Sequence, residues 1–160
     1  MPTTKADIDR EISWFNEQLD KVQAEFSRLL REAGHTVEVG STSTTNQEEL
    51  SGTYETTRYH IVVDGDLELT LHPYGIWLIG AHGRIDVKGP SGTEKLIYLK
   101  RGGSALRVEI SSGGKSIESE SRSMFQNIEE DGWYWYDDSS YRTVAKLSRE
   151  VVEAILERVQ

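Results

Sequence analysis

The stretch TKADIDREISWFNEQLDKVQAEFSRLLREAG, from Thr4 to Gly34, decides the fold of this chain. Its apolar residues recur at alternating steps of four and three, at Ile8, Ile12, Phe15, Leu19, Val22, Phe26, Leu29 and Ala33. This spacing places them on one face of a long helix. Thr4 with Asp7 resembles a capping box at the start, and Gly34 predicts the left-handed end.

Two interpretations of this apolar stripe stay open. A regular four-three spacing is typical of a coiled-coil seam, which would make the chain a homodimer or a structural subunit that oligomerises through this helix. Trp14 and Leu30 widen the stripe, however, and a wide stripe favours packing on a sheet of the same chain. We expect the second arrangement.

The pattern changes to a period of two after the helix. Val37 and Val39 alternate with Glu38 and predict a strand, whereas the polar stretch Gly40 to Gly52 is typical of a loop. Residues 53–72 predict a hairpin, because an apolar run is followed by the turn pair Asp64-Gly65 and then by a strand in which every second residue is leucine.

Glycine-containing turns divide the chain that follows. We expect turns at Pro73 to Gly75, Gly80 to Gly83, Gly89 to Gly92, Gly102-Gly103 and Gly113-Gly114. The strands expected between them are residues 76–79, 84–88, 96–100, 106–110 and 115–122. Short strands joined by hairpin turns predict an antiparallel meander and exclude a parallel doubly wound sheet.

The C-terminal part adds one more strand and a helix. Trp133 to Tyr136 predict a strand with tryptophans on one face and tyrosines on the other, and Ser148 predicts the cap of a final helix. Residues 141–147 fit either the strand or the helix. The sequence therefore predicts one α+β domain, residues 1–160: a long N-terminal helix on the concave face of a strongly twisted, half-barrel-like meander of seven or eight strands, and a C-terminal helix beside it.

Composition limits the classes of partner. The net charge is −9 and there is no cysteine, which excludes disulfides, thiolate zinc sites and thiol nucleophiles. An acidic surface repels nucleic acid and anionic lipid, so we expect neither as a partner.

The first residues lack the apolar run of a signal peptide, and no stretch is long and apolar enough to span a membrane. We expect a cytoplasmic protein.

No motif for catalysis is complete. Gly113-Gly114-Lys115-Ser116 lacks the first glycine of a phosphate-binding loop, and Ser91 lacks the second glycine of a nucleophile elbow. The four histidines, His35, His60, His72 and His82, lack the spacing of zinc ligands. The sequence predicts a non-catalytic protein with no cofactor and no metal.

The most unusual local composition combines carboxylates with aromatic residues near Trp133. Tyrosines on the outer face, surrounded by carboxylates, would suit the cationic groups of a partner protein. The expected partner-binding residues are Glu129, Glu130, Tyr134, Tyr136, Asp137 and Asp138. The preferred hypothesis is an acidic interaction protein that binds or inhibits a protein with a basic surface.

A second hypothesis is a small-molecule pocket. In this case the curved sheet and the long helix would enclose a cavity, and His60, His72 or a nearby carboxylate would contact or act on the ligand. The apolar run at residues 76–79 would form one enclosed strand of that cavity.

Overall fold

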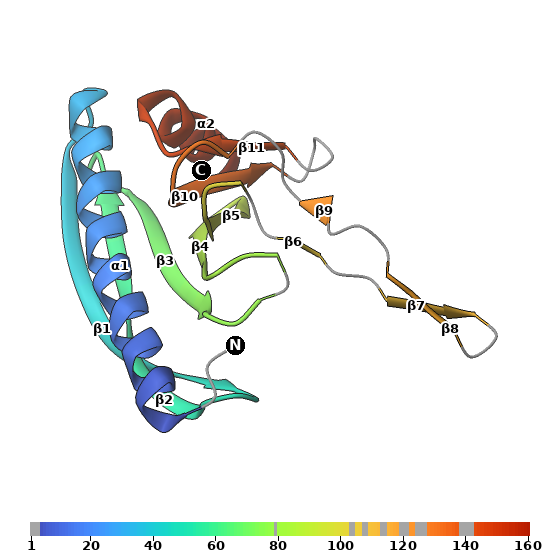
Figure 1. Cartoon of the computed structure of the whole chain (residues 1–160). Coiled ribbons are helices and arrows are strands. Elements are labelled where there is room, and N and C mark those ends of the chain that lie inside the picture. The colour runs from blue at the N-terminus through green and yellow to red at the C-terminus, as the bar shows by residue number, and fades with distance from the viewer. Residues whose placement is uncertain are drawn as a thin grey trace.

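The protein consists of two helices and a seven-stranded open antiparallel sheet, as a computed structural model shows for residues 4–78, 80–102, 105–106, 109–112, 115–118, 122–123, 128–137 and 143–160 (Figure 1). The helices are α1 (Lys5–Glu32) and α2 (Arg149–Val159). The strands of the sheet, in spatial order, are β1 (Val37–Glu48), β2 (Gly52–Val63), β3 (Leu67–Gly75), β4 (Arg84–Gly89), β5 (Gly92–Leu99), β10 (Gly132–Asp137) and β11 (Thr143–Lys146). The predicted α+β class is confirmed.

The chain leaves the sheet between β5 and β10. This excursion contains β6 (Ala105–Leu106), β7 (Glu109–Ser112), β8 (Lys115–Glu118) and β9 (Arg122–Ser123). β6 pairs with β9 and β7 pairs with β8, and in Figure 1 they project away from the helices. Of the strand expected at 106–110, residue 106 belongs to β6 and residues 109–110 belong to β7. Of the strand expected at 115–122, the structure describes β8 and the first residue of β9.

The long helix begins and ends where the sequence predicts, and the C-terminal helix begins at its predicted cap. The Thr4 side chain accepts a hydrogen bond from the Asp7 backbone N–H, and Gly34 adopts a left-handed φ of 96° after the last turn of α1. The Ser148 side chain accepts from the Val151 N–H and caps α2. Residues 143–146, left open by the sequence, form a strand. Neither described helix is long and apolar enough to cross a bilayer.

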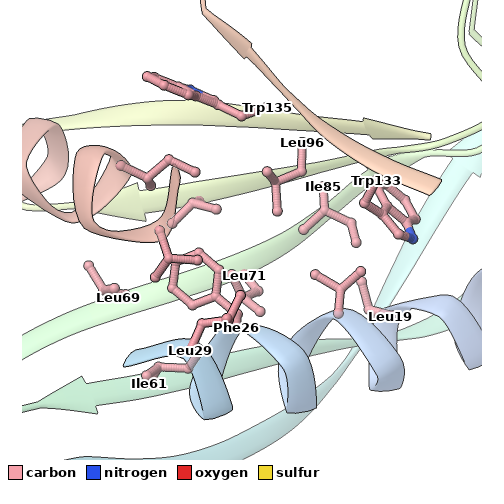
Figure 2. Close-up of a cluster of buried hydrophobic side chains, with 14 of the residues drawn as sticks. Leu19, Phe26, Leu29, Ile61, Leu69, Leu71, Ile85, Leu96, Trp133 and Trp135 are labelled. Atoms are coloured by element: carbon pink, nitrogen blue, oxygen red, sulfur yellow. The ribbon is translucent and has the colours of Figure 1, made fainter. Parts of the chain in front are cut away.

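Both helices pack on the same face of the sheet. Figure 2 shows Leu19, Phe26 and Leu29 of α1 directed toward the side chains of several strands. On the sheet side, this core contains Ile61, Val63, Leu69, Leu71, Ile85, Val87, Leu96, Trp133 and Trp135. The apolar stripe of α1 therefore lies in the core of its own chain, as expected from its width.

The expectation of a loop from Gly40 to Gly52 is wrong. β1 continues to Glu48 and pairs with β2 in register along its whole length, from Val37 opposite Val63 to Glu48 opposite Gly52. Most of its side chains are exposed, so the strand carries no apolar alternation. Its serines and threonines fit an extended, solvated edge strand, because β-branched residues favour extended backbone and hydroxyls tolerate water.

The expected turn at Pro73 to Gly75 is also wrong. β3 continues through these residues and pairs with β4, with a register shift between Pro73 and Gly75. Proline is tolerated there because a bulge removes the need for its missing N–H. Residues 76–78 then leave the sheet and form no strand, apart from one isolated bridge between Leu78 and Ala81. The last residue of the strand expected at 76–79 lies outside the described residues.

Truncation of the two core phenylalanines of α1 tests this account of the core. Phe15 and Phe26 are fully buried, so we expect Phe15→Ala and Phe26→Ala each to lower the free energy of unfolding by about 3 to 5 kcal/mol. Chemical denaturation measures this change. The exposed Ser13→Ala on the same helix is the control, with an expected change within about 0.5 kcal/mol. Equal stability of all three variants would contradict the core assignment.

Candidate functional site

The aromatic segment predicted as a partner-binding face lies inside the sheet. β10 pairs with β5 on one side and β11 on the other. Trp133 and Trp135 face the helices, and their indole N–H groups donate to Gln18 Oε1 at 3.1 Å and to Glu94 Oε2 at 3.3 Å. Alternation of the rings is confirmed, with the tryptophans in the main core.

The tyrosines occupy the opposite face, but Tyr134 is not exposed as expected. It is 6% exposed and packs in a second cluster with Ile97, Leu99 and Ile128. Its hydroxyl donates to the Glu130 carbonyl at 2.8 Å. Residues just before β10 cover this part of the outer face, which the strand pattern alone does not reveal. Tyr136 is half-buried.

The carboxylates near this segment differ in their surroundings. Asp137 accepts two hydrogen bonds from Arg158, at 2.7 and 3.1 Å, and Glu130 forms an ion pair with Lys146. Glu129 is exposed, and Asp138 lies outside the described residues. At least two of the predicted contact residues therefore already pair with cations of the same chain.

An open pocket of about 1070 Å³ lies elsewhere, between the first half of α1 and the loop after β3. Four parts of the chain build it: α1, residues 76–78 with 81–82, the end of β5, and the residue before β10. Its lining residues are Asp7, Arg10, Glu11, Trp14, Ile76, Trp77, Leu78, Ala81, His82, Tyr98, Lys100 and Asp131. Segments distant in sequence thus meet around one space.

Aromatic rings form one wall of this pocket. The Trp14 ring contacts those of His82 and Tyr98 edge to face, with centroids 4.8 Å apart in both pairs. Tyr98 in turn contacts Trp133 of the main core at 5.5 Å. The wall is therefore fixed to the core of the protein, and edge-to-face pairs of this kind add stability beyond area burial.

Glu48, the last residue of β1, holds the part of the pocket formed by Ile76 and Trp77. Its carboxylate accepts hydrogen bonds from the Ile76 N–H at 3.1 Å and the Trp77 N–H at 3.2 Å, and also from the Tyr54 hydroxyl. Burial and the Glu48 carboxylate raise the pKa of Tyr54. A side chain at Gly75 would place its Cβ 2.9 Å from the Glu48 carboxylate, so it would displace this carboxylate from its hydrogen bonds.

Two polar atoms on the pocket residues lack partners among the residues that the structure describes. They are Glu11 Oε2 and Trp77 Nε1, and both are buried. The other Glu11 oxygen lies 3.6 Å from His82 Nε2. A buried polar atom without a hydrogen bond costs free energy, so Glu11 and Trp77 each retain hydrogen-bonding capacity that the described residues do not use.

The pocket uses a different histidine from those the sequence suggested. His60 and His72 lie on the other face of the sheet, opposite Thr70 and Asp86 of neighbouring strands, whereas His82 lines the pocket. Glu11 and Trp14 were recognisable as polar and aromatic residues flanking the apolar stripe of α1. Within the described ranges, no group of three or more histidines and carboxylates is placed to hold a metal ion.

Comparisons of the chain with protein-family models, with curated proteins and with solved structures found no match. The functional argument therefore depends on the geometry of the pocket.

Replacement of Glu48 tests its role in forming the pocket. Glu48→Gln exchanges one accepting oxygen for a donor that faces backbone N–H groups, so we expect a loss of about 1 to 3 kcal/mol of stability. Hydrogen exchange should become faster at the Ile76 and Trp77 amides in particular. The neighbouring exposed Glu49→Gln is the matched control. Unchanged exchange at both amides in Glu48→Gln would refute this role.

Protonation of His82 should oppose folding. Burial lowers the pKa of His82 although the Glu11 carboxylate opposes this shift, and burial also lowers the pKa of His72; Lys100 and Lys88 respectively lower the two values further. The unfolded chain therefore binds more protons at these sites, and stability rises with pH across the window from about 5 to 7. We expect denaturation midpoints to fall as the pH drops through this window, and less steeply in His82→Gln. A His82 ring titration with a midpoint above 6.5 would contradict the sign.

Proposed function

We propose that this protein binds a small organic molecule with a planar ring in the pocket beside α1. The observation that carries the proposal is the combination of an aromatic wall with two buried polar atoms, Glu11 Oε2 and Trp77 Nε1, that have no partner among the described residues. Ligand sites in proteins are typically concave, with apolar and aromatic walls beside polar groups that orient the ligand, and six of the twelve lining residues here are apolar or aromatic.

The size and rigidity of the site support this function. A volume of about 1070 Å³ lies just above the usual range of small-molecule sites, so the pocket has room for a ligand with a planar ring. Both walls are fixed before any ligand arrives: one by ring contacts that continue to Trp133, the other by the hydrogen bonds of Glu48. A site that is already formed loses less conformational entropy when it binds.

Binding to a protein with a basic surface is the second proposal. It is supported by the net charge of −9 and by the exposed carboxylate of Glu129. Glu130 and Asp137 would have to exchange their ion pairs with Lys146 and Arg158 for contacts with the partner. The pocket requires no such exchange, and for this reason it is the preferred proposal.

A ligand-binding experiment with simple ring compounds tests the pocket. We expect phenyl and naphthyl compounds at millimolar concentration to shift the indole N–H resonances of Trp14 and Trp77 in NMR spectra, and Trp77→Ala to weaken their binding at least fivefold. The matched control is Tyr74→Ala, because Tyr74 is an aromatic residue that is 49% exposed and does not line the pocket.

Two results would overturn the proposal. One is that no ring compound of any charge shifts the pocket resonances. The other is that Tyr74→Ala and Trp77→Ala weaken binding equally while both variants keep the melting temperature of the parent protein.

A further inference from the structure

We infer that the ligand of this pocket carries a protonated amine, which pairs with Glu11 while the ring of the ligand packs on the aromatic wall. This inference rests on the proposed function and adds the chemical class of the ligand. It is argued from the unused hydrogen-bonding capacity of Glu11, from the charges around the pocket, and from the rings.

Glu11 is the polar group best placed to select a cation. Its side chain is 24% exposed and lines the pocket, yet Oε2 is buried and has no hydrogen-bond partner within the described part of the chain. Rotation about the last side-chain torsion exchanges the two oxygens, so a donor arriving from the pocket can reach the carboxylate. Hydrogen bonds to an ionised carboxylate are about twice as strong as those between neutral groups.

The remaining charges of the pocket do not favour an anion. Three carboxylates and two basic side chains line it. Arg10 is ion-paired with Asp7 one turn earlier on α1, and Lys100 is exposed at the end of β5. Asp131 accepts a hydrogen bond from the Arg101 backbone N–H at 2.7 Å. The carboxylates outnumber the basic side chains by one, so the lining of the pocket carries a net charge of −1.

The aromatic wall also favours a cation. An ammonium group within about 6 Å of a ring centroid is attracted by the electron-rich face of the ring, most strongly by that of tryptophan. Trp14, Trp77 and Tyr98 line the same pocket as Glu11. Aromatic rings beside a carboxylate favour organic ammonium ions, because the ring faces attract the cation while the carboxylate supplies the opposite charge.

Three phenyl compounds of similar size separate the ligand classes: 2-phenylethylamine, 2-phenylethanol and 3-phenylpropionate. We expect the amine to bind the full chain at least tenfold more tightly than the alcohol, as measured by calorimetry or by NMR titration at pH 7. Glu11→Gln, which keeps the side-chain shape, should abolish this preference but leave the affinity for the alcohol within twofold. The retained alcohol affinity shows that the variant is folded.

Glu17→Gln is the matched control, because Glu17 is exposed on the same helix and does not line the pocket. It should keep the full preference for the amine. Equal affinities for amine and alcohol, or an amine preference that survives in Glu11→Gln, would overturn the inference while the pocket function stands. A preference for 3-phenylpropionate would overturn it in favour of an anion bound by Lys100. Failure of all three compounds to bind would overturn the pocket function itself.

Discussion

The packing of the apolar stripe of α1 on one face of the sheet is the interaction on which the rest of the structure depends. A helix of 28 residues is about 42 Å long, and its buried residues begin at Phe15. The first turns, before Phe15, therefore extend beyond the fully buried part of the stripe. There the side chains of Glu11 and Trp14 face the loop after β3 rather than the centre of the core. One element thus supplies both the stability of the domain and one wall of its pocket.

The other wall depends on a polar interaction at the far end of β1. A strand with mostly exposed side chains contributes little to the core, but it carries Glu48 to the point where the chain leaves the sheet after Gly75. The Glu48 carboxylate replaces the strand partners that the Ile76 and Trp77 N–H groups have lost. Irregular backbone next to a cavity needs such a partner, because unpaired buried N–H groups are costly. The length of β1 and the shape of the pocket are therefore linked.

The sequence predicted those parts of the fold that have a strong local signal. Both helices carry a periodic apolar face and a cap, and the Asp64-Gly65 hairpin has alternating leucines. β1 was missed because its exposed residues leave no alternation to detect, and the burial of Tyr134 was missed because Ile128 covers it from outside the strand. A pocket between the sheet and the long helix was the second hypothesis from the sequence, but the residues that meet in it could not be predicted, since residues near 11, 77, 98 and 131 come together only through tertiary packing.

The excursion between β5 and β10 has a consequence for how the domain tolerates changes in chain length. Its base is closed by a hydrogen bond of 2.8 Å from the Gly102 N–H to the Ile128 carbonyl, and Leu99 pairs directly with Gly132. The last two strands and α2 therefore join the meander by closing a long loop. The entropy of loop closure grows only logarithmically, by about 0.6 kcal/mol for each doubling of length. A change in the length of the chain between Gly102 and Ile128 would therefore change the free energy of folding little. This is the place where the domain could accept an inserted sequence.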